Sequence, residues 1–282
     1  MVSFLGQLNA RVKKEDFKMV RKIVVLSFFV IVAILAATAV FAANADTSSF
    51  SIAPPPIANP VFDAKEKDQK IRVTYLTMES SPTTSASSQF KLKGYGLDMV
   101  ARKAFNSVLA IDGGIGVTYL DGTMGSGSTA GTLTGMTIPL TVNLEVQPVK
   151  TDVFSLIMFV GPQFGISMMQ IDLPGMYITS DSYVYGLQVG AQMGFNINDT
   201  IGIDLFGMTL SQAGSQDTYI SSTYYSDSIS SDIPSFTTTT YGLDFVYLPW
   251  GLALSSILQE AGKSESTGMK THMYQFAWSH KF

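Results

Sequence analysis

Apolar and polar side chains alternate one for one along most of this sequence beyond residue 70. The clearest stretch is 136–147, where apolar side chains take the even positions and Thr, Asn, Glu and Gln most of the odd ones. A repeat of two is that of a β-strand, whose successive side chains point to opposite faces. The stretches 154–168 and 183–197 continue it, whereas a globular strand averages about five or six residues. A tilted strand crosses a bilayer with about 9–11 residues, so the pattern predicts membrane-spanning strands.

We predict an all-β fold in which ten antiparallel strands close into a transmembrane β-barrel over residues 71–282. Two strands are ambiguous, because 71–78 is short and 251–260 suits a helix as well as a strand. A barrel of eight strands is therefore the alternative. The predicted strands are 71–78, 89–101, 108–119, 133–147, 153–170, 183–197, 200–211, 237–248, 251–260 and 270–282.

The connections between these strands alternate in length. Short connections are predicted at 102–107, 148–152 and 198–200, and long ones, rich in Gly, Ser, Thr and Asp, at 122–131, 172–182 and 212–236. Outer-membrane barrels have short periplasmic turns and long extracellular loops. The alternation therefore predicts the direction of every strand and puts both ends of the barrel in the periplasm.

The segment before the strands has the layout of an export signal. An apolar run over 23–41 follows two basic residues and precedes small residues at Ala43 and Ala45. This predicts a signal peptide over 1–45, cleaved after Ala45, with the true start at Met19. The alternative is an uncleaved anchor, because the run is long enough to span a bilayer.

Residues 46–70 are predicted to be a periplasmic linker. They include three consecutive prolines, which favour extended and solvated backbone, and end in a mixed-charge run that cannot form a core.

The C-terminal strand has aromatic side chains on every second residue. This face consists of His272, Tyr274, Phe276, Trp278, His280 and Phe282. Aromatic rings prefer the membrane interface, where one edge is apolar and the other is wet.

With its terminal Phe282, this strand resembles the targeting strand of bacterial outer-membrane proteins, with the porin-like and opacity-type barrels as nearest relatives. The resemblance covers about residues 71–282. It implies insertion into outer-membrane lipid of a Gram-negative bacterium. It also implies recognition of Tyr274, Phe276, Trp278, His280 and Phe282 by the barrel-assembly machinery.

The polar face of the predicted strands carries a set of ionisable side chains that we expect in the barrel lumen. Their acidic members fall in the periplasmic half. One interpretation is an internal salt-bridge plug, as is usual in narrow barrels, and the other is a constriction that favours small cations. The set is Arg72, Asp98, Asp112, Glu145, Asp204, Asp244 and Lys281.

Composition narrows the remaining functions. The chain has no cysteine and two histidines, which excludes thiolate chemistry and a His-rich metal site. Beyond residue 45 it holds 12 basic and 20 acidic residues, so nucleic acid is not an expected partner. Ser279 and His280 point to opposite faces of one strand and cannot form a nucleophile–base pair.

We therefore predict a small porin-like or structural envelope barrel, with no enzymatic activity, metal or cofactor. The alternative is an interaction barrel that binds extracellular ligands through loop 212–236, which carries three tyrosines. An outer-membrane lipase or protease is the weakest hypothesis.

Overall fold

The computed structural model describes residues 67–82, 90–124, 130–223, 225–261 and 269–281. The predicted signal peptide, its cleavage site at Ala43 and Ala45, and most of the predicted linker lie outside these ranges. The described ranges contain ten strands: β1 (Lys67–Pro82), β2 (Phe90–Ala104), β3 (Leu109–Met124), β4 (Gly131–Lys150), β5 (Phe154–Leu173), β6 (Met176–Asn196), β7 (Ile201–Ser222), β8 (Ser226–Tyr247), β9 (Leu252–Ala261) and β10 (Met269–Lys281).

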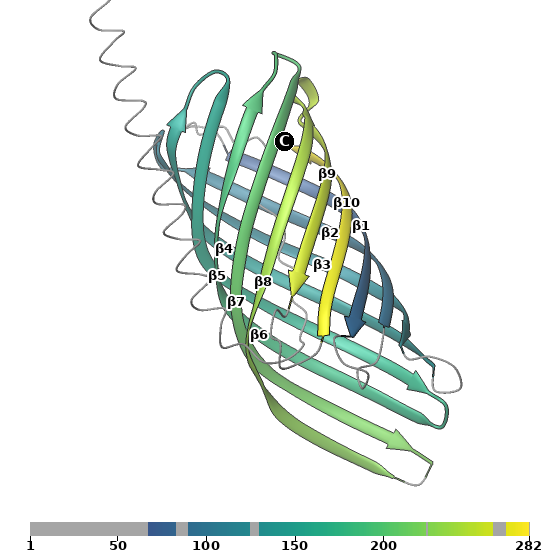
Figure 1. Cartoon of the computed structure of the whole chain (residues 1–282). Helices are drawn as coiled ribbons and strands as arrows, with labels where there is room; N and C mark the ends of the chain where they lie inside the picture. Colours follow the sequence, from purple (N-terminus) through teal and green to yellow (C-terminus); the bar gives the residue numbers. More distant parts are fainter. Residues whose placement is uncertain (1–66, 83–89, 125–129, 224, 262–268, 282) are drawn as a thin grey trace, which may run out of the picture.

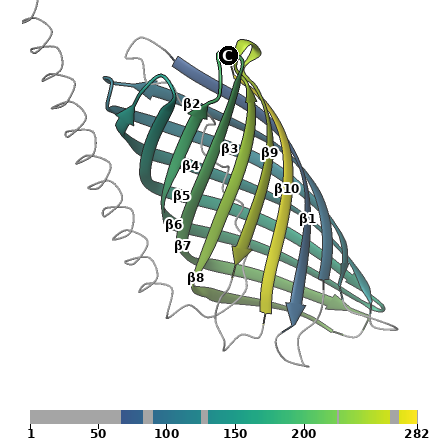
Figure 2. The same ribbon diagram turned by 45° about the horizontal axis from the view of Figure 1, so that its top comes forward.

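These strands form one antiparallel sheet in which each pairs with its neighbours in the chain (Figures 1 and 2). β1 pairs with β2 on one side and with β10 on the other, which closes the sheet into a barrel. Thr74, for example, lies opposite Gly96 of β2 and Ala277 of β10. The all-β antiparallel prediction is confirmed. Among the described residues, no helix is long and apolar enough to cross a membrane.

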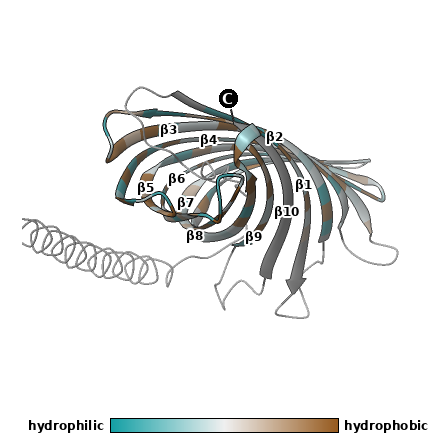
Figure 3. Ribbon diagram, turned by 90° about the horizontal axis from the view of Figure 1, so that it is seen from above, coloured by the Kyte–Doolittle hydropathy of each residue, from teal (hydrophilic) through white to brown (hydrophobic). Residues whose placement is uncertain are grey.

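Hydrophilic and hydrophobic residues are interspersed along the strands (Figure 3), and the exposure of their side chains follows the alternation in the sequence. On β3 the side chains of Ile115, Val117 and Tyr119 are 39% to 52% exposed, whereas Thr118, between the last two, is 3% exposed. Apolar side chains therefore cover the outer face, and every second side chain is enclosed. A soluble protein would bury the apolar rows instead, so this arrangement favours a wall that lies in lipid.

At one end of the barrel the strands are joined by tight turns that Asn and Thr side chains stabilise. The Oδ1 of Asn106 accepts hydrogen bonds from the backbone N–H groups of Val108 and Leu109, both at 2.8 Å. In the turn between β6 and β7, the Oδ1 of Asn198 accepts hydrogen bonds from the backbone N–H groups of Thr200 and Ile201 in the same way. Such local bonds satisfy backbone donors where the strands end. We call this end the short-turn end.

The opposite end differs from the prediction. Segments 172–182 and 212–236 were expected to be long loops, but both consist largely of paired strand. β5 and β6 stay in register to the pair Leu173 and Met176, and β7 and β8 remain paired, with one register shift between Gln212 and Gly214, to the pair Ser221 and Ser226. Their polar side chains resemble those of a loop because these hairpins extend past the apolar part of the wall (Figure 1). We call this end the long-hairpin end.

Two further strand boundaries differ from expectation. β1 begins at Lys67, so the last part of the predicted linker is strand. Residues 252–261, for which helix and strand were both open, form β9 after a short 3-10 turn at Leu248–Trp250.

Candidate functional site

A layer of charged side chains fills the barrel interior near the short-turn end. The structure places six members of the predicted lumen set here and adds two cations that the sequence analysis assigned elsewhere. Lys281 lies on β10, and its side chain is outside the described part of the chain. The enclosed charged residues, each at most 5% exposed, are Lys70, Arg72, Asp98, Arg102, Asp112, Glu145, Asp204 and Asp244.

Arg72 of β1 and Asp98 of β2 form the first ion pair of this layer. The residues are opposite each other in the register, and both Nε and Nη2 of Arg72 donate to one carboxylate oxygen, at 3.0 and 2.6 Å. Gly116 of β3 makes room for this pair, because a Cβ there would collide with the Asp98 carboxylate. A small residue on one strand thus allows a charged side chain on the next to lie flat against the wall.

Arg102 of β2 and Glu145 of β4 form the second pair, with two parallel hydrogen bonds. Nε donates to Oε2 at 2.6 Å and Nη2 donates to Oε1 at 2.7 Å, and the Glu145 side chain is fully enclosed. This bidentate geometry is the strongest that an arginine and a carboxylate can make. The sequence analysis missed Arg102 because it began a turn at that residue. The available signal was the alternation along the strand, because Arg102 and Asp98 both have even numbers and so lie on the same face.

The third group brings two carboxylates together across β7 and β8. Asp204 and Asp244 are direct partners in the register, and Nζ of Lys70 lies 3.9 Å from Asp244. Gln192 of β6 donates to Asp204 at 3.2 Å. Lys70 was missed because it fell in the predicted linker, although it shares its face with Arg72.

Asp112 of β3 links the charged pairs to a chain of amides. Its Oδ1 accepts a hydrogen bond from Asn143 at 2.8 Å, and Gln188 of β6 donates in turn to Asn143. The second oxygens of Asp112, Asp204 and Asp244 accept no hydrogen bond from the described residues. Buried acceptors of this kind can be satisfied by water, a proton or a cation.

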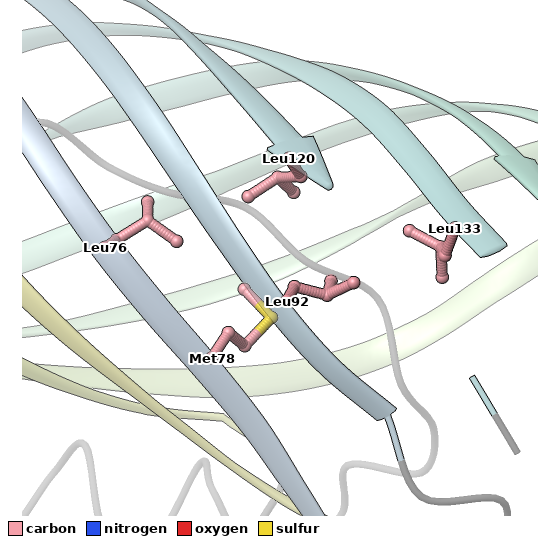
Figure 4. Packing of buried hydrophobic residues seen from close by; sticks show 5 residues of the cluster. All are labelled: Leu76, Met78, Leu92, Leu120 and Leu133. Atoms are coloured by element: carbon pink, nitrogen blue, oxygen red, sulfur yellow. The ribbon is translucent and has the colours of Figure 1, made fainter. Parts of the chain in front are cut away.

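A second, apolar layer lies inside the barrel toward the long-hairpin end, where the sequence analysis expected a polar lumen. Figure 4 shows its main cluster, with side chains from four neighbouring strands turned toward one another. Its members are Leu76, Met78, Leu92, Leu120 and Leu133, with Met169 and Ile171 packed against them. A further cluster on β6 and β8 consists of Val184, Ile233 and Phe236. The enclosed side chains thus include a charged group toward the short-turn end and apolar groups toward the long-hairpin end.

The outer face carries aromatic side chains at two heights. Toward the long-hairpin end Tyr75, Tyr95 and Tyr119 are register partners across β1 to β3, and the first two rings lie 5.4 Å apart. Toward the short-turn end Phe154 packs on Phe195, and Tyr247 on Trp250. On β2 to β4 the exposed residues between these heights are aliphatic, including Leu97, Met99, Ile115, Leu140, Val142 and Leu144.

Comparisons with known proteins agree with this architecture. No family model and no curated protein matches the chain. The solved structure of the outer-membrane protease OmpT from Escherichia coli aligns with a TM-score of 0.58 at 9% identity, over 80% of this chain and 98% of that one. OprG from Pseudomonas aeruginosa aligns at 0.42 (12% identity, 79% and 99%) and Ail from Yersinia pestis at 0.35 (14% identity, 77% and 99%). The alignment with OmpT shows that the chain has the fold of a bacterial outer-membrane β-barrel.

Proposed function

We propose that the chain is a closed, ten-stranded barrel of the outer membrane, with a filled lumen and no enzymatic activity, which holds its long hairpins on the extracellular side. The observation that carries the proposal is the enclosed charge layer. Arg72 with Asp98 and Arg102 with Glu145 lie along the inner wall as ion pairs, and none of these four residues is more than 4% exposed. Narrow barrels are filled by side chains in this way.

The spacing of the aromatic side chains supports the membrane assignment. The exposed Phe105, just beyond β2, comes ten positions after the exposed Tyr95 on that strand. At about 3.3 Å per residue and a typical tilt of about 40°, that is roughly 25 Å across the membrane. The apolar band of an outer-membrane barrel has about this height, with aromatic side chains at both edges. The short-turn end would then face the periplasm.

In planar lipid bilayers, the refolded barrel is expected to show no stepwise conductance, because the ion pairs fill the interior. Replacing Arg72 and Asp98 together with Ser removes one pair without leaving an unpaired charge and is expected to open a conducting path. Steady, cation-selective steps from the unaltered protein would contradict the filled lumen. They would favour the constriction lined by Asp204 and Asp244. Peptide hydrolysis by the same preparation would contradict the non-enzymatic part of the proposal.

A second candidate function is contact with extracellular ligands through the β7–β8 hairpin. The hairpin continues past the pair Gln212 and Phe236, whereas the described pairs of β8 with β9 begin only at Thr238. β8 therefore has one neighbouring strand over this stretch. Near the tip Tyr225 donates a hydrogen bond to Asp227, which lowers the pKa of that carboxyl below its usual range. Tyrosines and serines on a rigid ribbon provide amphipathic contact area.

Shortening this hairpin is expected to leave the barrel intact. Joining Gln212 to Phe236 through Asn-Gly keeps their register, because a two-residue turn of this type closes an antiparallel pair. Heat-modifiable gel migration should remain, while adhesion of the bacteria to host-cell or glycan surfaces should fall. Unchanged adhesion, with the shortened barrel at normal abundance, would remove the interaction hypothesis.

A further inference from the structure

A groove opens on the outer wall of the barrel across β1 to β4, on the side of the charge layer that faces away from the lumen. Its volume is about 380 Å³, within the range of roughly 300–1,000 Å³ that ligand pockets occupy. The outward-facing residues along it are Gln69, Ala101, Lys103, Ile111, Gly113 and Val142.

Two small residues form the floor of the groove. Gly113 of β3 has Ala101 and Val142 as its register partners on the neighbouring strands. A Cβ built on Gly113 would meet only a backbone oxygen at 3.6 Å, which is an ordinary contact. The space above Gly113 is therefore open. By contrast, the inward-facing Gly116 on the same strand is covered by Asp98.

The position of the groove decides what can occupy it. Ala101 lies four residues from Phe105 along β2, on the membrane side of the aromatic side chains at the short-turn end. Exposed aliphatic side chains, Ile115 and Leu144 among them, lie beside it on β3 and β4, and the exposed Gln69 borders it on β1. Within the bilayer such a hollow meets hydrocarbon. Lys103 lies two residues nearer the interface, is exposed, and has Lys67 as its register partner on β1.

From this juxtaposition we propose that the groove is a phospholipid site of the periplasmic leaflet. One acyl chain lies over Ala101 and Gly113, and the phosphate contacts Lys103. The hollow is apolar where the chain would lie and cationic at the depth of the headgroup, which is the charge arrangement that a phospholipid requires. The inference rests on the membrane assignment proposed above.

Native mass spectrometry of the full refolded chain, titrated with palmitoyl-oleoyl phosphatidylglycerol, tests the site. The unaltered barrel is expected to retain one lipid. Gly113→Leu should abolish this retention by filling the groove. Lys103→Gln should weaken it about fivefold, the change that corresponds to roughly 1 kcal/mol for one lysine near a phosphate.

Two matched controls lie on the same outer face. Gly207 of β7 also admits a Cβ without a clash, because the nearest atom is a Tyr241 ring carbon at 3.6 Å, and Lys93 is an exposed lysine at the other end of β2. Gly207→Leu and Lys93→Gln should both bind as the unaltered barrel does. Heat-modifiable migration checks that each variant folds. If Gly113→Leu does not fold, Ala101→Val takes its place and should reduce retention.

Equal retention by all variants, or no retained lipid on a folded barrel, overturns the site. So does a Gly113→Leu variant that loses a dimer instead of a lipid, because the groove would then be an interface between copies. Failure of the membrane assignment is distinguishable from these results. In that case the unaltered chain would be found soluble without detergent, before any lipid is added.

Discussion

Replacing Arg102 with Met is expected to lower the free energy of unfolding by about 3–5 kcal/mol, the largest effect of a single substitution in this barrel. Glu145 is fully enclosed and accepts two hydrogen bonds from Arg102, so the substitution leaves a carboxylate without a counter-ion in a site of low polarity. Urea-induced unfolding of the protein in lipid vesicles measures the change.

The matched control removes both partners. Replacing Arg102 and Glu145 together with Met should recover most of the lost stability, because an apolar pair of similar volume often substitutes for a buried ion pair. If the double variant is as unstable as Arg102→Met, the loss comes from packing rather than from the unpaired charge. A single variant as stable as the original would contradict the enclosed ion pair itself.

The second large effect is expected on the opposite face of the same strand. Met99 is about half exposed and lies midway between the aromatic side chains Tyr95 and Phe105 on β2. Met99→Arg places a cation near the middle of the apolar band and should cost about 2–4 kcal/mol of unfolding free energy in vesicles.

Ser215→Arg provides the comparison for this substitution. Ser215 is exposed on β7, beyond the register pair at which the long hairpin leaves the wall. A charge there meets water, so the stability of the barrel should not change. Equal losses at both positions would mean that depth in the membrane does not set the cost, and the apolar band would be misplaced.

The alternation of side chains made the fold predictable, because lipid on one face and enclosed side chains on the other leave a period of two in the sequence. The same parity anticipated Asp98, Asp112 and Glu145 as neighbours inside the barrel. It could not show which side chains pair with one another. The Arg102–Glu145 pair joins β2 to β4 across β3, and this requires the curvature of the closed sheet.

Strand ends were harder to predict than strand faces. Lys70 and Arg102 were assigned to a linker and a turn because charged residues at a strand end resemble a loop. The long hairpins were missed for a related reason: outside the bilayer both faces of a ribbon meet water, so the alternation disappears at Asp172 and again at Gln212. The apolar inner layer lies on the same strand face as the charged residues, as Leu76 does with Arg72. Along each strand its apolar side chains alternate with the apolar side chains of the outer wall, so no polar–apolar alternation marks them.

The orientation of the β3 side chains tests the account most directly. The chain has no native cysteine, so single cysteines can be placed at each position from Gly114 to Tyr119 except Gly116, where Asp98 leaves no room, and spin-labelled in vesicles. Collision with lipid-dissolved oxygen should peak at positions 115, 117 and 119 and be low at 114 and 118. Peaks at the even positions, or uniformly low collision with oxygen along β3, would show that the Ile, Val and Tyr rows face a dry centre and would contradict a wall in lipid.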